Sequence, residues 1–198
     1  MSFRTILLIS CFQIFPVMLS AQVTHDSNES TKLETWKLIQ SDFELQLVQR
    51  SPDQTRGFFQ GRGFTKQQAN DIATQCVLQA IVKNRASNEK NPAISVSLKE
   101  WRVKVNGQIQ SVKLKEDWAK QWSLIQDESH KVKKSAQIAF RWATFPSQQT
   151  FQPGGDYNWG MISFGLKPGE KFDLHVFWKA GEQLSDEWIR GMECPKDL

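Results

Sequence analysis

Apolar residues alternate with polar ones in several short segments of this 198-residue chain, and this pattern predicts β-strands. The alternation is clearest in the second half, where Phe172, Leu174, Val176 and Trp178 occupy every second position. Because successive side chains of a strand point to opposite faces, this spacing indicates a strand with one buried face. Similar alternations or β-branched apolar runs predict further strands over 43–47, 76–83, 94–105, 109–114, 136–145 and 159–164.

The segment 94–105 is counted as one strand, although its apolar positions change parity near Trp101. A one-residue shift of this kind is typical of a β-bulge, so the chain has seven predicted strands. Asn106-Gly107 then predicts a tight hairpin, because both residues adopt the positive φ angles that a two-residue turn requires. A three-residue loop that pairs Val105 with Ile109 is the alternative.

Two helices are predicted between the first and second strands. Ser51 is a good N-cap residue, a proline follows it, and Gln54 completes a capping box. Thr65 and Gln68 repeat the capping-box spacing at the start of the second helix. A third helix is predicted over 116–125, where tryptophan residues recur at helical spacing.

Together these elements predict a mainly β protein with the architecture of an antiparallel immunoglobulin-like β-sandwich. The sandwich is expected to span residues 41–181, with a short helical segment over 51–75 before the second strand. A small barrel with a helical plug is the alternative. The likeness concerns architecture alone, because the Cys-Trp-Cys spacing of antibody domains is absent. Residues 22–40 are expected to form a flexible leader, and 182–198 an amphipathic C-terminal tail.

The first 21 residues have the pattern of a secretory signal peptide. Arg4 supplies a positive charge, an apolar stretch follows it, and small residues end at Ala21, where cleavage is predicted. The alternative is lipidation at Cys11, which ends a short lipobox-like sequence. The apolar stretch is short for a permanent anchor, so no stable membrane span is expected after cleavage. The sequence therefore predicts a periplasmic or secreted protein.

The formal net charge of +4 at pH 7 is small, and the basic residues are scattered along the chain. The tightest basic run is Lys131, Lys133 and Lys134, beside His130. A solvated loop accounts for this run better than a nucleic-acid surface, since an exported protein rarely meets nucleic acid. Nucleic acid is therefore not expected as a partner.

Cys76 and Cys194 remain after Cys11 leaves with the signal peptide. An even cysteine count in an oxidising compartment permits one disulfide, which would tie the C-terminal tail to the body of the protein. In the chain-entropy model such a bridge stabilises the fold by about 4 kcal/mol. The alternative is a buried thiol at Cys76 and a free thiol at Cys194.

The chain lacks the sequence motifs of serine hydrolases, zinc metalloproteases, P-loop enzymes and thiol oxidoreductases. Asp173 and His175 lie two residues apart on one predicted strand face, where they could act as a base and its orienting acid. A solvent-facing polar side of a half-buried strand explains the same pair without catalysis. An enzyme is therefore not expected.

Metal binding is a second hypothesis, with Met161, His175 and Cys194 as candidate ligands. Thioether, imidazole and thiolate groups suit Cu(I), and copper handling is a common task of small exported β-sandwiches. The residues lack the spacing of a metal motif, and a methionine among aromatic residues usually fills gaps in a core. No other cofactor is expected.

The chain contains eight tryptophan residues, which indicates either a large aromatic core or an aromatic binding surface. Trp101, Trp118, Trp142 and Trp159 have apolar neighbours at structural periods and are expected in the core. Trp188 lies in the expected tail and is a candidate for a partner surface.

The glycine-rich segment that follows Ser51 adds three more partner-surface candidates, namely Arg56, Phe59 and Arg62. The functional interpretation is contact with an anionic partner. The alternative is a helix that docks its phenylalanine and ends at Gly63.

A set of residues in this region forms a recognisable pattern: Arg50-Ser51-Pro52-Asp53-Gln54, Phe58-Phe59, Arg62-Gly63-Phe64, Cys76 and Asn84. On these residues, the chain resembles an uncharacterised group of exported bacterial proteins that share an aromatic-x-x-Arg-Gly-Phe segment. The resemblance covers about residues 50–180, and that group carries no known activity, so it implies no functional residue.

These observations predict an exported, non-enzymatic protein that binds a partner protein or assists assembly. The alternative is a periplasmic accessory protein that handles copper. A third hypothesis, a hydrolase or carbohydrate binder, would use exposed tryptophan and acidic side chains.

Overall fold

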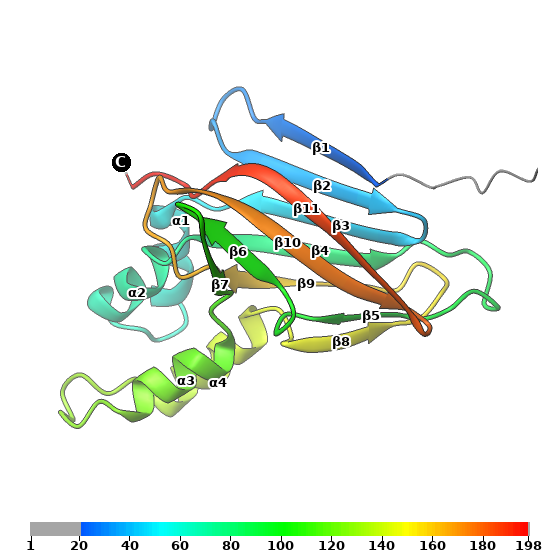
Figure 1. The fold of residues 1–198 in the computed structure, drawn as a ribbon. Helices are drawn as coiled ribbons and strands as arrows, with labels where there is room; N and C mark the ends of the chain where they lie inside the picture. Colours follow the sequence, from blue (N-terminus) through cyan, green and yellow to red (C-terminus); the bar gives the residue numbers. More distant parts are fainter. Residues whose placement is uncertain (1–20, 198) are drawn as a thin grey trace, which may run out of the picture.

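The computed structural model describes residues 21–197 and consists of two antiparallel β-sheets that pack face to face (Figure 1). The predicted mainly β sandwich is confirmed. The signal peptide and the lipidation site at Cys11 lie outside the described residues, except for Ala21. The first sheet has the order β1-β2-β3-β4-β9, formed by β1 (Gln22–Ser27), β2 (Glu34–Gln40), β3 (Phe43–Gln49), β4 (Val77–Asn84) and β9 (Tyr157–Ser163).

The second sheet is built around β10, which pairs with β11 on one edge and with β5 and β6 on the other. Strand β8 then pairs with β5, and β7 pairs with β6. The first sheet is a meander of four consecutive strands joined by β9, so immunoglobulin-like connectivity is not confirmed. The strands are β5 (Ile94–Ser97), β6 (Arg102–Val105), β7 (Gln108–Ser111), β8 (Gln148–Phe151), β10 (Lys171–Ala180) and β11 (Gln183–Glu193).

Strands β5 and β6 replace the single bulged strand that was predicted over 94–105. Val96 pairs with Trp178, and Arg102 pairs with His175, so both strands follow the same edge of β10. These two pairs are three residues apart along β10 but six apart along the facing segment. The interruption is therefore a turn of the chain rather than a one-residue bulge. In this turn the amide of Glu100 donates a hydrogen bond to the carbonyl of Ser97.

The sandwich core forms where the alternating positions of the two sheets meet, as the pattern of β10 predicts. Leu174 and Val176 are fully buried, and Trp178 stacks on Phe43 of the first sheet at 4.2 Å between ring centroids. Trp101 is also fully buried, and its indole N–H donates to the carbonyl of Phe177 at 3.0 Å. Burial of these large side chains stabilises the contact between the sheets.

Four helices gather at one end of the sandwich (Figure 1), and they add a second apolar cluster on the outer face of the first sheet. They are α1 (Pro52–Gln60), α2 (Lys66–Ala73), α3 (Lys115–Ser123) and α4 (Lys134–Ala143). Both predicted capping boxes, at Ser51 and Thr65, are present. The helices pack their aromatic side chains over Val77 of β4 and Met161 of β9.

The predicted strand over 136–145 is wrong, because this segment forms α4. Ile138, Phe140 and Trp142 alternate as in a strand, but Ala136, Phe140 and Ala143 also recur at helical spacing, and these three are buried. Packing against α3 and β9 favours the helical face. Trp142 consequently points outward with 85% of its surface exposed, so its predicted place in the core is also wrong.

The leader predicted over 22–40 and the tail predicted over 182–198 are also wrong, because they form β1, β2 and β11. Trp36 of β2 and Ile189 of β11 are buried, so both segments contribute to the core. All six residues of β1 are exposed, and backbone pairing with β2 places this strand at the sheet edge. The polar composition of these segments concealed strands that backbone hydrogen bonds hold in place.

The Asn106-Gly107 hairpin is confirmed with a two-residue loop, because Val105 pairs with Gln108. Asn106 has a φ of 50° and Gly107 a φ of 80°, the left-handed conformations that such a loop requires.

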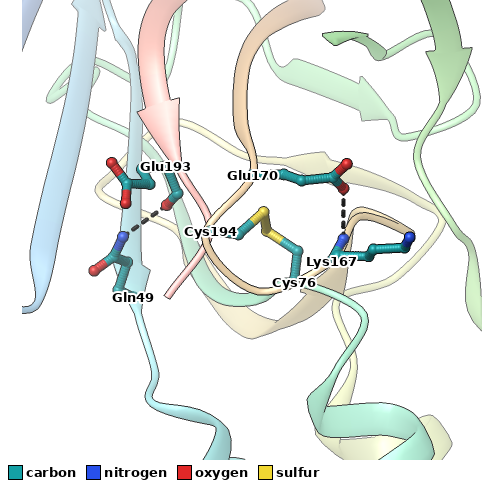
Figure 2. Close-up of a disulfide and its surroundings, with 6 residues drawn as sticks. All are labelled: Gln49, Cys76, Lys167, Glu170, Glu193 and Cys194. Carbon is teal, nitrogen blue, oxygen red and sulfur yellow. Dashed lines mark hydrogen bonds between the residues drawn. A yellow bond between two sulfur atoms is a disulfide. The ribbon is translucent and has the colours of Figure 1, made fainter. Parts of the chain in front are cut away.

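Cys76 and Cys194 form a disulfide, so the alternative of two free thiols is wrong (Figure 2). The bond joins the residue before β4 to the residue after β11 and therefore links the two sheets. Beside it, the side-chain amide of Gln49 donates to the carbonyl of Glu193 at 2.7 Å (Figure 2). Within residues 21–197, none of the helices is long and apolar enough to cross a membrane.

Candidate functional site

Strand β9 carries aromatic side chains on the outer face of the first sheet, next to the helical layer. Trp159 pairs with Ile81, and Tyr157 pairs with Lys83, on the face opposite the sandwich core. Trp159 keeps 50% of its surface exposed, so its predicted place in the core is wrong. The helices thus cover only part of this face and leave an aromatic edge beside them.

A pocket of about 320 Å³ opens at this boundary, between α1 and the paired strands β4 and β9. We call it the α1 pocket. Its volume lies near the lower end of the range for small-molecule sites, which is about 300–1,000 Å³. Its lining consists of Arg50, Gln54, Thr55, Phe58, Gln79, Trp159 and Met161.

Arg50 is the charged residue of the α1 pocket. It follows β3 directly and precedes the N-cap residue Ser51, so a strand and a helix fix its backbone. Its guanidinium donates a hydrogen bond to the side-chain oxygen of Gln79. Among the ion pairs of residues 21–197, none involves Arg50. A guanidinium has five N–H donors, so donors remain for a ligand.

Thr55 of α1 supplies a second polar group at the pocket. The residue is 1% exposed, and its hydroxyl oxygen has no hydrogen-bond partner among residues 21–197. A buried hydroxyl without a partner costs about 1–3 kcal/mol, so such a group in a native pocket calls for an explanation. A ligand that hydrogen-bonds to the hydroxyl would provide one.

The remaining wall of the α1 pocket is apolar and polarisable. Phe58 is half-buried, and Met161 is 8% exposed between the pocket and the helical cluster. The guanidinium of Arg62 lies 3.3 Å from the ring centroid of Phe58 and donates to the Phe58 carbonyl at 3.0 Å. The pocket therefore combines one cation and one hydroxyl with aromatic and thioether surfaces.

A second hollow lies at the open end of the sandwich, between the ends of β2 and β10. Its volume is about 470 Å³, and Phe43 and Trp178 line it with Gln40. The side-chain oxygen of Gln40 is buried without a hydrogen-bond partner among residues 21–197. The one charged group here, Asp42, already accepts a hydrogen bond from Asn91 at 2.9 Å. We therefore favour the α1 pocket.

The four predicted partner-surface residues have different environments. Phe59 is 0% exposed and belongs to the helical cluster, so its assignment to a surface is wrong. Arg56 donates to Asn70 at 2.9 Å and pairs with Asp53 and Asp197, which ties α1 to α2 and to the C-terminal segment. Arg62 is exposed beside Phe58. Trp188 lies on the other sheet.

Trp188 belongs to a cluster on the outer face of the second sheet. Its ring stacks on the His175 ring with 4.2 Å between the ring centroids, and the Phe177 ring lies 4.1 Å from the His175 ring. His175 Nε2 lies 2.6 Å from a carboxylate oxygen of Asp186, while Asp173 accepts from the amide of Gly191 at 2.9 Å. The acid beside His175 is therefore Asp186 of β11 rather than Asp173, the residue that the sequence offered as its possible orienting acid.

The three candidate metal ligands do not come together. Met161 lies on the outer face of the first sheet, and His175 lies on the outer face of the second. The sulfur of Cys194 is bonded to Cys76 and cannot act as a thiolate. Across the described residues, no group of three or more His, Cys, Asp or Glu side chains is placed to hold a metal ion.

Electrostatic perturbations lie away from the α1 pocket. The hydrogen bond from Arg56 lowers the pKa of Asp197, and the same bond raises the pKa of Arg56. In the loop between α3 and α4, the hydroxyl and amide of Ser129 lower the pKa of Asp127 to about 2. Burial lowers the pKa of Lys113, whose ammonium group lies over the Trp118 ring. None of these groups lines the α1 pocket.

No protein-family model, no curated protein and no solved structure matches this chain. The pocket was not predicted from the sequence, because its residues come from three separate segments, 50–58, 79 and 159–161. The signals that were present were the position of Arg50 directly before a capped helix and the unusual tryptophan content.

Proposed function

We propose that this chain is an exported, non-enzymatic binding protein, and that the α1 pocket is its ligand site. The observation that carries the proposal is that the buried hydroxyl of Thr55 has no hydrogen-bond partner among residues 21–197, in a pocket that Arg50 also lines. Both groups gain hydrogen bonds when a ligand enters, so binding relieves a cost that the folded protein otherwise bears.

The lining of the α1 pocket favours binding over catalysis. None of its seven residues is a histidine, cysteine, aspartate or glutamate, the side chains that most often act as acid, base or nucleophile. The ligand is a small molecule or an exposed group of a partner protein. The disulfide supports export, since such bonds persist mainly in oxidising compartments.

Two-dimensional NMR of the protein tests this proposal with a mixture of small acids, alcohols and amides that carry apolar groups. Binding in the α1 pocket is expected to shift the indole signal of Trp159 and the side-chain amide signal of Gln79. The indole of Trp142, which is exposed outside the pocket, serves as an internal control.

Trp159→Leu and Trp142→Leu form a matched pair of variants for the same experiment. The first is expected to weaken binding about tenfold, and the second to leave it within twofold. The proposal fails if no compound at millimolar concentration shifts the Trp159 and Gln79 signals, or if the Trp142 signal shifts equally.

A further inference from the structure

The charge of the α1 pocket indicates what kind of ligand it takes. We infer that the ligand is a carboxylate joined to a small apolar or aromatic group, an inference that rests on the proposed binding function. Arg50 supplies the one positive charge of the lining, and no acidic side chain lines the pocket to neutralise it. A ligand with a single negative charge therefore complements the site.

The donors of the pocket match the acceptors of a carboxylate. A planar guanidinium binds the two oxygens of a carboxylate through two parallel N–H donors. Because Gln79 accepts from Arg50 through its side-chain oxygen, its NH₂ group is left as a further donor. The Thr55 hydroxyl donates to a remaining lone pair. A carboxylate thus complements the donors of Arg50, Gln79 and Thr55.

The same features disfavour phosphate. A phosphate group carries more charge and commonly binds the free amides at a helix N-terminus. At the start of α1, Ser51 accepts from the amide of Gln54 at 3.2 Å, and Gln54 accepts from the amide of Ser51 at 3.2 Å. This capping box already uses those two amides. A second cation is also absent from the lining.

The apolar wall requires the rest of the ligand to be apolar. Trp159, Phe58 and Met161 present aromatic and thioether surface within the same pocket. Trp159 is half exposed, so an apolar group that covers its ring removes that surface from water. The volume of about 320 Å³ limits this group to roughly the size of a phenyl ring or a short alkyl chain.

A carboxylate of this kind has two sources, a free small acid or the C-terminus of a peptide that ends in an apolar residue. Both present the same groups to Arg50 and Trp159. A peptide would add contacts beyond the pocket, along the exposed edge at Tyr157. The two sources are separated by comparing 3-phenylpropionate with the peptide acetyl-Gly-Gly-Phe.

Calorimetry of the protein with five probes tests the inference. We expect 3-phenylpropionate to bind at least tenfold more tightly than 3-phenylpropanol, and inorganic phosphate to bind weakest. Acetyl-Gly-Gly-Phe with a free carboxylate is expected to bind at least tenfold more tightly than its amide. A peptide acid that binds more tightly than 3-phenylpropionate identifies a chain terminus as the source, and the reverse order identifies a small acid.

Variants locate the effect at the pocket. Arg50→Gln is expected to lower the affinity for 3-phenylpropionate at least tenfold and Thr55→Val about threefold, and Arg50→Gln should lower the affinity for 3-phenylpropanol by a smaller factor than it lowers that for 3-phenylpropionate. Arg50→Lys, which keeps the charge but loses the planar fork, should give an intermediate loss. Arg62→Gln is the matched control, because Arg62 contacts Phe58 but does not line the pocket.

The outcomes separate this inference from the proposed function. Equal affinities for 3-phenylpropionate and 3-phenylpropanol, with both shifting the Trp159 signal, overturn the carboxylate inference and leave the binding pocket in place. Tighter binding of phosphate than of 3-phenylpropionate overturns it as well. If none of the probes shifts the Trp159 and Gln79 signals, both the inference and the proposed function fail.

Discussion

The outer faces of the two sheets carry similar kinds of side chains, but polar groups on them differ in whether they have partners within the described residues. On the second sheet, the carboxylate of Asp186 meets His175, and Arg102 donates to the carbonyls of Lys99 and Trp101. On the first sheet, Arg50 forms no ion pair within the described residues, and the Thr55 hydroxyl is buried without a partner there.

This difference separates a structural surface from a candidate site. Both faces combine histidine or arginine with tryptophan, and composition alone would not distinguish them. A polar group that already has its partner gains little from a ligand, whereas an unpartnered buried group gains a full hydrogen bond. The comparison therefore favours the proposed ligand site beneath α1 over the His175 cluster.

The largest expected effect comes from removing the helical cover of the first sheet. Phe59→Ala deletes a fully buried ring that packs on Phe64 and Phe140, and we expect a loss of about 3–5 kcal/mol in the free energy of unfolding. Urea denaturation followed by circular dichroism measures this loss. The half-buried neighbour Phe58 is the control, and Phe58→Ala should cost less. A loss below about 1 kcal/mol for Phe59→Ala would contradict the buried cluster.

An effect of the same size is expected for the covalent link between the sheets. The double variant Cys76→Ser, Cys194→Ser opens a bridge across a sequence separation of 118 residues. The chain-entropy model predicts a loss of about 4–5 kcal/mol for a loop of this length. Thermal unfolding of the variant and of the reduced native protein should give the same melting temperature. A variant as stable as the oxidised protein would show that the bond does not form.

A smaller effect tests the comparison of the two faces directly. Thr55→Val replaces the unpartnered hydroxyl with a methyl group, so we expect stability to stay unchanged or to rise by about 1 kcal/mol. Asp186→Asn weakens the contact of this half-exposed carboxylate with His175, so we expect a loss of about 0.5–1 kcal/mol. Chemical denaturation of both variants at pH 7 decides the matter. Destabilisation by Thr55→Val beyond that of Asp186→Asn would reverse our assignment.

The smallest expected effect is a pKa shift in the loop that joins α3 to α4. Asp127 is fully exposed, and hydrogen bonds from Ser129 and His130 lower its pKa from 3.8 to about 2. A lowered pKa in the folded state means that this contribution is present above about pH 4 and is lost as the pH falls toward 2. An NMR titration of the carboxyl carbon should give a midpoint near 2.

Ser129→Ala removes the strongest of these hydrogen bonds and should raise the Asp127 midpoint toward 3.8. Ser123→Ala is the control, because the Ser123 hydroxyl donates to the Lys120 carbonyl instead. Equal midpoints in the two variants would show that Ser129 does not hold the carboxylate.

Local chemistry in the sequence determined several elements correctly. Ser51 and Thr65 start helices with capping boxes, and Asn106-Gly107 forms a two-residue hairpin. The alternation along β10 predicted which of its side chains are buried. Each of these features depends on residues within about one turn or one strand, so the sequence pattern contains the relevant interactions.

Tertiary structure decided the remaining features. The apolar residues of the α4 segment fit both the two-residue period of a strand and the spacing of a helix. Only contacts with α3 and β9 select the helix. Strand β11 exists because β10 offers backbone partners along its length, and its polar side chains gave no such signal. Trp142 and Trp159 are exposed because the apolar cluster closes without them.

The α1 pocket shows most clearly which features the sequence determines and which the tertiary structure decides. The sequence determined the capped helix and placed Arg50 immediately before it. Only the pairing of β4 with β9 brings Gln79 and Trp159 to the same place, although about 80 residues separate them in the chain. Whether a polar group is left without a partner depends on every segment that packs around it, and that is a property of the folded molecule alone.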